Sequence, residues 1–132
     1  RAEHRKGFDA LLEAVGLLSA GGDLPAFELR LLGVSQGDLP SDLPDAVRSR
    51  LVPLGRQPGE ALHEEYERAH IVVAPSRYES FGLVYEEAVA YGRAVVASAE
   101  DASAREAIGG VGELAGEAVN CSLMFWYMAG SC

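Results

Sequence analysis

The chain has 132 residues, enough for one domain with a hydrophobic core and too few for two ordinary domains. Its formal net charge of -9 repels phosphate backbones and anionic lipid, which argues against a nucleic-acid or membrane-surface role. No apolar run reaches the roughly 18 residues of a membrane span, and no signal peptide is visible. Cys121 and Cys132 lack metal-ligand spacing, so we expect reduced thiols in a cytoplasmic protein without a bound metal.

The first half of the chain alternates helix-like and strand-like patterns. Apolar residues recur at helical spacing from Gly7 to Ala20, and Gly21-Gly22 supplies a stop, so we predict an amphipathic helix there. The stretch FELRLLG at residues 27–33 is largely alternating and indicates a strand. A polar loop then leads into a short helix at about residues 45–50, and LVPLG at 51–55 is a second short apolar run.

The second half of the chain repeats this alternation. A helix is predicted to begin at Gly59, and the β-branched IVVAP at residues 71–75 indicates a buried strand. LVYEEAVAYG indicates a helix that Gly92 ends, and AVVAS at 94–98 indicates another buried strand. Strands that alternate with helices at this spacing form parallel βαβ units. The predicted fold class is therefore α/β, a mostly parallel sheet with helices on both faces.

The loop PSRYESFG, residues 75–82, is the first candidate for a ligand site because ligands of such sheets bind beyond the carboxyl ends of the strands. The first amides of the following helix, at about 81–84, point outward unpaired and attract anions. Glu79 precedes this turn, and Glu87 lies roughly 7 to 8 Å along the helix axis from Gly82 at about 1.5 Å per residue. Carboxylates accept hydrogen bonds from hydroxyls, so this layout suits a nucleotide sugar, whose phosphates lie between two hydroxylated rings.

Two simpler interpretations of the acid pair stay open at this point. Both acids could be exposed residues on a solvated helix face, as Glu86 is interpreted to be. The pair could also serve as acid and base of a hydrolase, although nothing else in the sequence indicates a hydrolase cleft. The three histidines are scattered and are interpreted as surface or helix-end residues rather than bases.

The segment PSRYESFGLVYEEAVAYGRAVVA, residues 75–97, resembles the signature of retaining glycosyltransferase family 4, an E-x7-E family with the two-domain GT-B architecture. The segment RAEHRKGFD is similar to that family's Arg and Lys-Gly stretch, with Arg1 and Lys6 in the matching places. Ala94 stands where the family usually has proline. The resemblance extends to about Glu113, and the tail CSLMFWYMAGSC does not share it.

This resemblance implies a Rossmann-like nucleotide-sugar-binding domain over residues 1–118, the C-terminal half of a GT-B pair, with an atypical tail at 119–132 outside the family fold. It implies catalytic roles for Arg1, Lys6 and Glu79, the two cations neutralising the donor diphosphate and Glu79 holding the transferred sugar. Neither a metal nor a cofactor besides the nucleotide-sugar donor is expected. Further donor contacts, many from backbone N–H groups, are implied for Ser80, Phe81, Gly82, Leu83, Val84, Glu87, Leu54 and Arg56.

The predicted function is the donor-binding part of an enzyme that moves a hexose from a UDP- or GDP-sugar to an acceptor hydroxyl. The acceptor, a glycan, lipid or small molecule, would bind an N-terminal domain absent from this sequence, so we expect the 132 residues alone to be inactive. Two alternatives are a non-catalytic nucleotide-sugar-binding module and a GT-B nucleotide-sugar epimerase. Nucleic acid and a membrane span are not expected.

Overall fold

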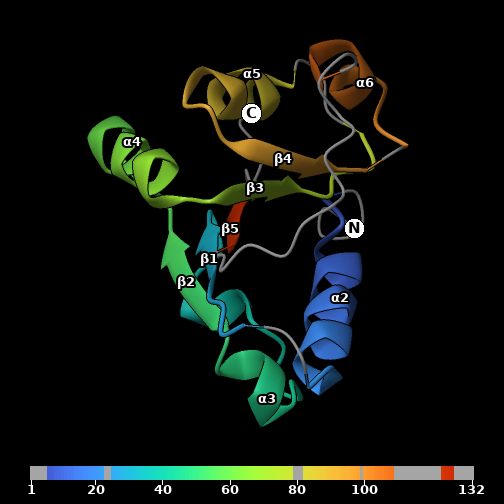
Figure 1. Cartoon of the computed structure of the whole chain (residues 1–132). Coiled ribbons are helices and arrows are strands. Elements are labelled where there is room, and N and C mark those ends of the chain that lie inside the picture. Colours follow the sequence, from blue (N-terminus) through green and yellow to red (C-terminus); the bar gives the residue numbers. More distant parts are fainter. Residues whose placement is uncertain (1–5, 23–24, 79–81, 99, 109–122, 127–132) are drawn as a thin grey trace.

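A single parallel sheet organises the chain in its computed structural model (Figure 1). The structure describes residues 6–22, 25–78, 82–98, 100–108 and 123–126. Within these residues the strand order is β2-β1-β5-β3-β4, and every pair is parallel. The strands are β1 Leu29–Leu32, β2 Leu51–Gly55, β3 Ile71–Ala74, β4 Ala94–Ala97 and β5 Leu123–Trp126. The predicted α/β class and parallel sheet are thereby confirmed.

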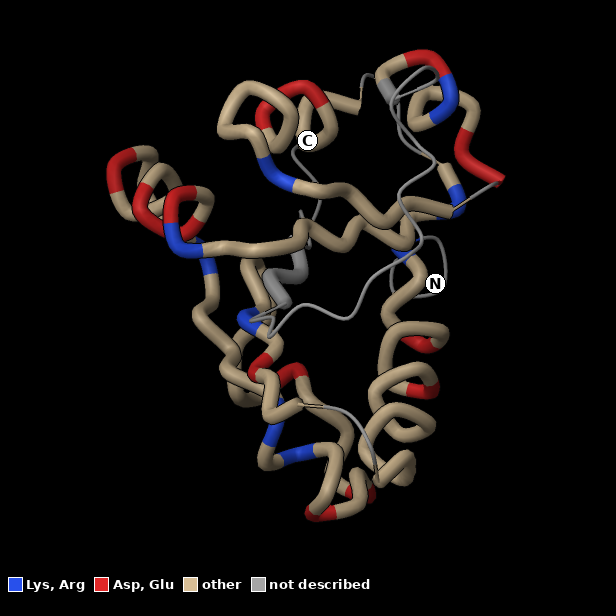
Figure 2. Tube along the Cα trace, in the orientation of Figure 1, with Lys and Arg blue, Asp and Glu red and all other residues tan. Residues whose placement is uncertain are grey.

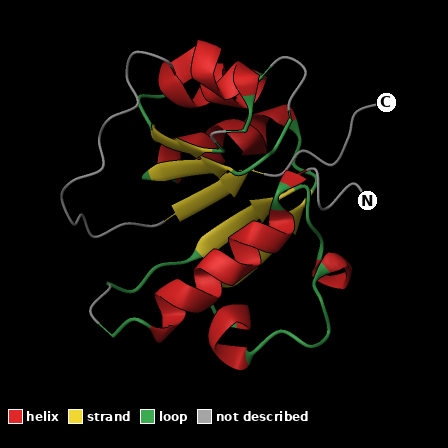
Figure 3. Ribbon diagram, turned by 90° about the vertical axis from the view of Figure 1, so that its right-hand side faces the viewer, coloured by secondary structure: helices red, strands yellow, loops and turns green. Residues whose placement is uncertain are grey.

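Helices cover both faces of this sheet (Figure 3). They are α2 Phe8–Ala20, α3 Asp45–Arg48, α4 Gly59–Arg68, α5 Leu83–Ala90 and α6 Ala102–Ile108, with a 3-10 turn η1 at Gln36–Asp38. One core lies between the sheet and α2 with α3, and a second lies between the sheet and α4, α5 and α6. Among the helices that the structure describes, none is long and apolar enough to cross a membrane.

The strands divide their side chains between these two cores in the two-residue period of a pleated strand. Leu29 and Leu31 of β1 face the core that contains α2, whereas Leu32 faces the other core. In β3, Val72 belongs to the core of α4 and α5, and Val73 packs against the opposite one. Burial on both faces explains why these strands read as nearly continuous apolar runs.

An ion pair with little solvent exposure joins β1 to α4. The Arg30 guanidinium donates to both Glu65 carboxylate oxygens, with distances of 2.6 Å from Nε and 2.8 Å from Nη2. The two side chains are 17% and 10% exposed. The hydrogen bond to Arg30 holds the pKa of Glu65 below its usual value, although burial opposes this. The pair therefore links the sheet to α4 with defined two-point geometry.

Part of the C-terminal tail belongs to the sheet. Within the segment 119–132, which we interpret from the sequence as an atypical tail, Leu123–Trp126 pairs with β1 on one side and β3 on the other. Leu123 lies opposite both Leu29 and Ile71. The physical reason is that β1 and β3 each present an unpaired edge, and a short apolar segment satisfies both edges at once.

Candidate functional site

The loop after β3 leads into α5 through a glycine turn, as the sequence predicts. Gly82 is the N-cap of α5 and has a φ of +64°, in the left-handed region that favours glycine. A β-carbon at this position would lie 2.9 Å from Cδ2 of Tyr85 and 3.1 Å from Oγ of Ser103. The start of α5 thus depends on glycine for its backbone conformation and for its close approach to α6.

A buried hydrogen-bond network supports this turn from below. Asp101 is 1% exposed and accepts hydrogen bonds on both carboxylate oxygens. Tyr85 Oη donates to Oδ2 at 2.6 Å, and the Ser103 N–H and Oγ donate to Oδ1 at 3.1 and 2.8 Å. Sequence reasoning did not single out Asp101, although an Asp directly before a helix is a recognisable N-cap signal.

The N-terminal segment lies against the beginning of the same loop. Gly7 has a φ of +72°, and a β-carbon there would lie 2.1 Å from the carbonyl oxygen of Pro75. The neighbouring Lys6 is only 5% exposed. In the first turn of α2, the Asp9 carboxylate accepts hydrogen bonds from Arg77 at 3.0 and 3.3 Å. The structure therefore brings the predicted Lys6 segment and the beginning of the predicted loop together. Lys6 is more buried than a lysine that binds phosphate at an open surface would be.

Glu87 is held from one side by a tyrosine of α4. Its carboxylate is partly buried, and Oε2 accepts a hydrogen bond of 2.8 Å from the Tyr66 hydroxyl. The Tyr66 ring stacks on Tyr91, with centroids 5.1 Å apart and planes 8° from parallel. Burial raises the pKa of Tyr66, and the hydrogen bond to Glu87 and its charge raise it further. The tyrosine therefore stays protonated, and its hydroxyl donates a hydrogen bond to Glu87.

The loop that follows β2 has a compact backbone. Gly55 has a φ of +64°, and its N–H donates to the carbonyl of Val34 at 2.8 Å. The Leu54 carbonyl accepts a hydrogen bond of 2.6 Å from Gln57 Nε2, and the Leu54 side chain packs against the core of α4 and α5. Arg56 is exposed. The predicted donor contacts Leu54 and Arg56 therefore lie at the end of β2 and directly after it, and the Arg56 side chain is exposed.

Comparison with known proteins identifies the chain. The family model "Glycosyl transferases group 1" matches residues 1–120. The chain belongs to the group 1 glycosyltransferases. It is 33% identical over 125 residues to an uncharacterized glycosyltransferase of Methanocaldococcus jannaschii, covering 91% of this chain and 29% of that protein. It is 37% identical over 110 residues to D-inositol 3-phosphate glycosyltransferase 1 of Catenulispora acidiphila, covering 75% of this chain and 26% of that protein.

A second enzyme with a similar name, the D-inositol 3-phosphate glycosyltransferase of Mycobacteroides abscessus, is 38% identical over 91 residues. The match covers 63% of this chain and 20% of that protein. The chain thus spans less than a third of the length of these curated relatives. No solved structure matches. The resemblance to a glycosyltransferase is confirmed for the group 1 glycosyltransferases as a whole.

The predicted site residues of this glycosyltransferase fall into two groups. Arg1, Glu79, Ser80 and Phe81 lie outside the described residues. The others are Lys6 on the N-terminal segment, Gly82, Leu83, Val84 and Glu87 at the N-cap and in the first turns of α5, Leu54 at the end of β2 and Arg56 directly after it. Leu83 is 56% exposed, whereas Val84 is 5% exposed and packs in the core, so Val84 can offer a ligand only its backbone.

Acidic residues occur on most of the helices that pack on the sheet. Figure 2 shows acidic positions on α2, α4, α5 and α6. An anionic ligand would therefore depend on local amides and cations rather than on the overall field. Within the part of the chain that the structure describes, no group of three or more His, Cys, Asp or Glu residues could hold a metal ion.

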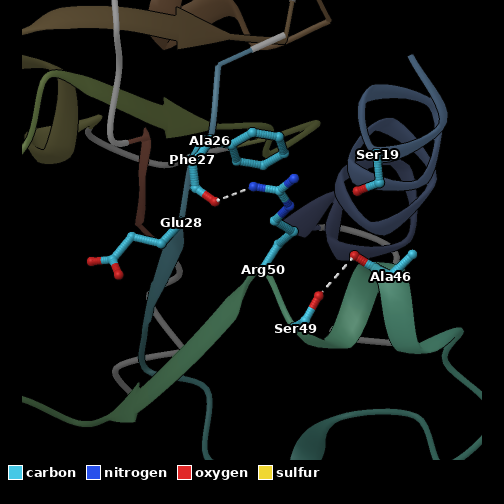
Figure 4. Close-up of a pocket in the computed structure, with 7 residues that line it drawn as sticks. All are labelled: Ser19, Ala26, Phe27, Glu28, Ala46, Ser49 and Arg50. Carbon is cyan, nitrogen blue, oxygen red and sulfur yellow. Dashed lines mark hydrogen bonds between the residues drawn. The ribbon is translucent and has the colours of Figure 1, made fainter. Parts of the chain in front are cut away.

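A separate hollow of about 580 Å³ lies at the amino ends of β1 and β2, at the opposite end of those strands from the loop after β2 (Figure 4). The Arg50 guanidinium lies 4.9 Å from the centre of the Phe27 ring. Oγ of Ser19 is buried there and has no hydrogen-bond partner among the described residues. The lining residues are Ser19, Ala26, Phe27, Glu28, Ala46, Ser49 and Arg50. None of them is a predicted donor-binding residue, so the site is defined by its loops and not by this hollow.

Proposed function

We propose that the chain is the donor-binding, C-terminal domain of a retaining family 4 glycosyltransferase that moves a hexose from a UDP- or GDP-sugar to an acceptor hydroxyl. One observation carries the proposal: the loop after β3 begins against the N-terminal segment, where Pro75 meets Gly7, and the glycine turn at Gly82 begins α5, the helix that carries the partly exposed Glu87. We expect a diphosphate between two hydroxylated rings to fit such an arrangement.

In this proposal the amides at the start of α5, together with Lys6 and Arg1, meet the donor diphosphate. Negative charge grows on the departing phosphate during transfer, so preset amides and cations stabilise the transition state more than the ground state. Glu79 holds the transferred sugar and Glu87 holds the ribose, in the E-x7-E pattern. The proposed chemistry uses no metal and no cofactor besides the donor, and we place the protein in the cytoplasm.

The acceptor binds outside these 132 residues in this proposal, so the chain alone has little or no activity. Positioning an acceptor beside the donor lowers the reaction barrier, by about 7–11 kcal/mol in well-oriented systems. The names of two relatives make inositol phosphate one acceptor to test, beside glycans, lipids and other small molecules.

Calorimetric titration of the full-length protein with UDP and GDP tests the donor site. We expect one of them to bind, and we expect Glu87→Gln to weaken binding about tenfold or more, because hydrogen bonds to a charged group contribute about 1.5–3 kcal/mol. Glu86→Gln is the matched control, since Glu86 is an exposed neighbour on the same helix. Absence of UDP and GDP binding, or equal effects of the two substitutions, would refute the donor site.

Turnover then separates transfer from its alternatives. A UDP- or GDP-hexose incubated with candidate acceptors should release nucleotide only when an acceptor is present. An isomerised donor formed without acceptor would indicate an epimerase instead. Donor binding with no turnover under any condition would indicate a non-catalytic binding module.

A further inference from the structure

We propose that Tyr66 is a positioning residue for Glu87, and that it sets one carboxylate oxygen of Glu87 to receive the ribose hydroxyls of the donor nucleotide. This inference rests on the proposed function, because it assigns the nucleoside part of the donor to Glu87. It adds a residue on a different helix, α4, to the site on α5.

The contact itself divides the Glu87 carboxylate into two oxygens with different roles. Oε2 accepts the 2.8 Å hydrogen bond from the Tyr66 hydroxyl. The described residues supply no hydrogen bond to Oε1. A phenol has one proton to donate, and a carboxylate accepts on both oxygens. The geometry leaves Oε1 as the acceptor for a diol such as the 2′ and 3′ hydroxyls of ribose.

The tyrosine can orient Glu87 because its own ring is fixed. Tyr66 is 1% exposed and stacks on Tyr91 with centroids 5.1 Å apart. Tyr91 is the C-cap of α5, and its N–H donates to the Glu87 carbonyl at 3.1 Å. Glu87 and Tyr91 are thus one helical turn apart on one face of α5. One ring from α4 contacts both, so it fixes the Glu87 side chain relative to the α5 backbone.

A second tyrosine–carboxylate pair shows what a purely structural contact looks like in the same chain. Tyr85 donates to Asp101 at 2.6 Å, and the Ser103 backbone and hydroxyl occupy the other oxygen of that carboxylate. Asp101 is 1% exposed, so its acceptor capacity is directed entirely into the protein. Glu87 differs on both counts, since it is partly exposed and one of its oxygens receives no hydrogen bond from the residues that the structure describes.

Fixing Glu87 before the ligand arrives should improve affinity by a modest factor. Immobilising a flexible side chain on binding costs about 0.5–1.5 kcal/mol, which corresponds to about two- to thirteenfold in the dissociation constant. The improvement should depend on the ribose hydroxyls, because only those hydroxyls use the positioned oxygen. This dependence separates a positioning role from a general contribution to stability.

The test compares the binding of a ribonucleotide with that of its 2′,3′-dideoxy form. The ribonucleotide is UDP or GDP, whichever the wild-type protein binds more tightly. Tyr66→Phe removes the hydroxyl and keeps the stacked ring. In the full-length protein we expect it to weaken ribonucleotide binding about three- to tenfold and to leave dideoxynucleotide binding unchanged. Tyr85→Phe is the control, and it should leave the ratio of the two affinities at the wild-type value. In a Glu87→Ala background, Tyr66→Phe should have no further effect on that ratio.

The outcomes are distinguishable from failure of the proposed function. If the wild-type protein binds neither UDP nor GDP, the donor site is wrong and this inference is wrong with it. If the wild type binds but Tyr66→Phe leaves the ratio unchanged, or lowers both affinities equally, the inference alone is wrong. Tyr91→Leu is a second variant, which keeps the Tyr66 hydroxyl and removes the ring that stacks on Tyr66. It should also weaken ribonucleotide binding relative to dideoxynucleotide binding.

Discussion

The close approach of Gly7 to Pro75 gives the sharpest test of how the two site segments are held together. Replacing Gly7 with alanine would add a β-carbon 2.1 Å from the Pro75 carbonyl oxygen, far inside van der Waals contact. The atom that it meets is backbone at the end of a buried strand, so a side-chain rotation cannot relieve the clash. The N-terminal segment and the loop must separate, or β3 must move.

Two effects add in this variant. A non-glycine residue in the left-handed region costs about 1–2 kcal/mol, and overpacking costs about 1–3 kcal/mol more. We therefore expect Gly7→Ala to lower the free energy of unfolding by about 2–5 kcal/mol. Gly92→Ala isolates the first effect, because Gly92 has a φ of +65° and a β-carbon there would meet nothing within 4 Å. Its expected loss is about 1–2 kcal/mol.

Urea unfolding followed by circular dichroism measures both losses in the same protein. Gly7→Ala should also weaken UDP or GDP binding, since it separates Lys6 from the loop, whereas Gly92→Ala should not. Equal destabilisation by the two substitutions would show that the segment and the loop are not in contact. If Gly7→Ala destabilises the protein more than Gly92→Ala does but leaves nucleotide binding unchanged, the contact between Gly7 and Pro75 is structural and has no part in the site.

Two further substitutions test other parts of the structure. Gly82→Ala combines the left-handed conformation with crowding against Ser103 at 3.1 Å, so urea unfolding should show a larger loss than Gly92→Ala, about 2–4 kcal/mol in total. Glu65→Gln should cost about 1.5–3 kcal/mol at neutral pH by weakening the bond to Arg30. Because the folded-state pKa of Glu65 is lowered, this contribution is present above its usual pKa and is lost as pH falls below it. Wild-type and Glu65→Gln stabilities should therefore converge in acid, and a constant difference would contradict the assignment.

Local patterns were sufficient for the elements that carry the site. The helical period over Gly7–Ala20 predicts α2, which begins at Phe8, and the β-branched run before Pro75 predicts β3. Glycine at position 82 predicts the turn into α5, because few other residues adopt a left-handed backbone there. These features depend on neighbouring residues in the chain, and sequence spacing is therefore a good guide to them.

The sequence by itself determined the α/β class, the glycosyltransferase resemblance and the position of the loop between β3 and α5. Tertiary structure alone decided that Leu123–Trp126 lies between β1 and β3, that Gly7 touches Pro75 and that Tyr66 holds Glu87. These contacts join residues far apart in the chain, and no local period or propensity encodes such a pairing. They form because buried strand edges, phenols and carboxylates each require a partner, which only the assembled sheet and its helices supply.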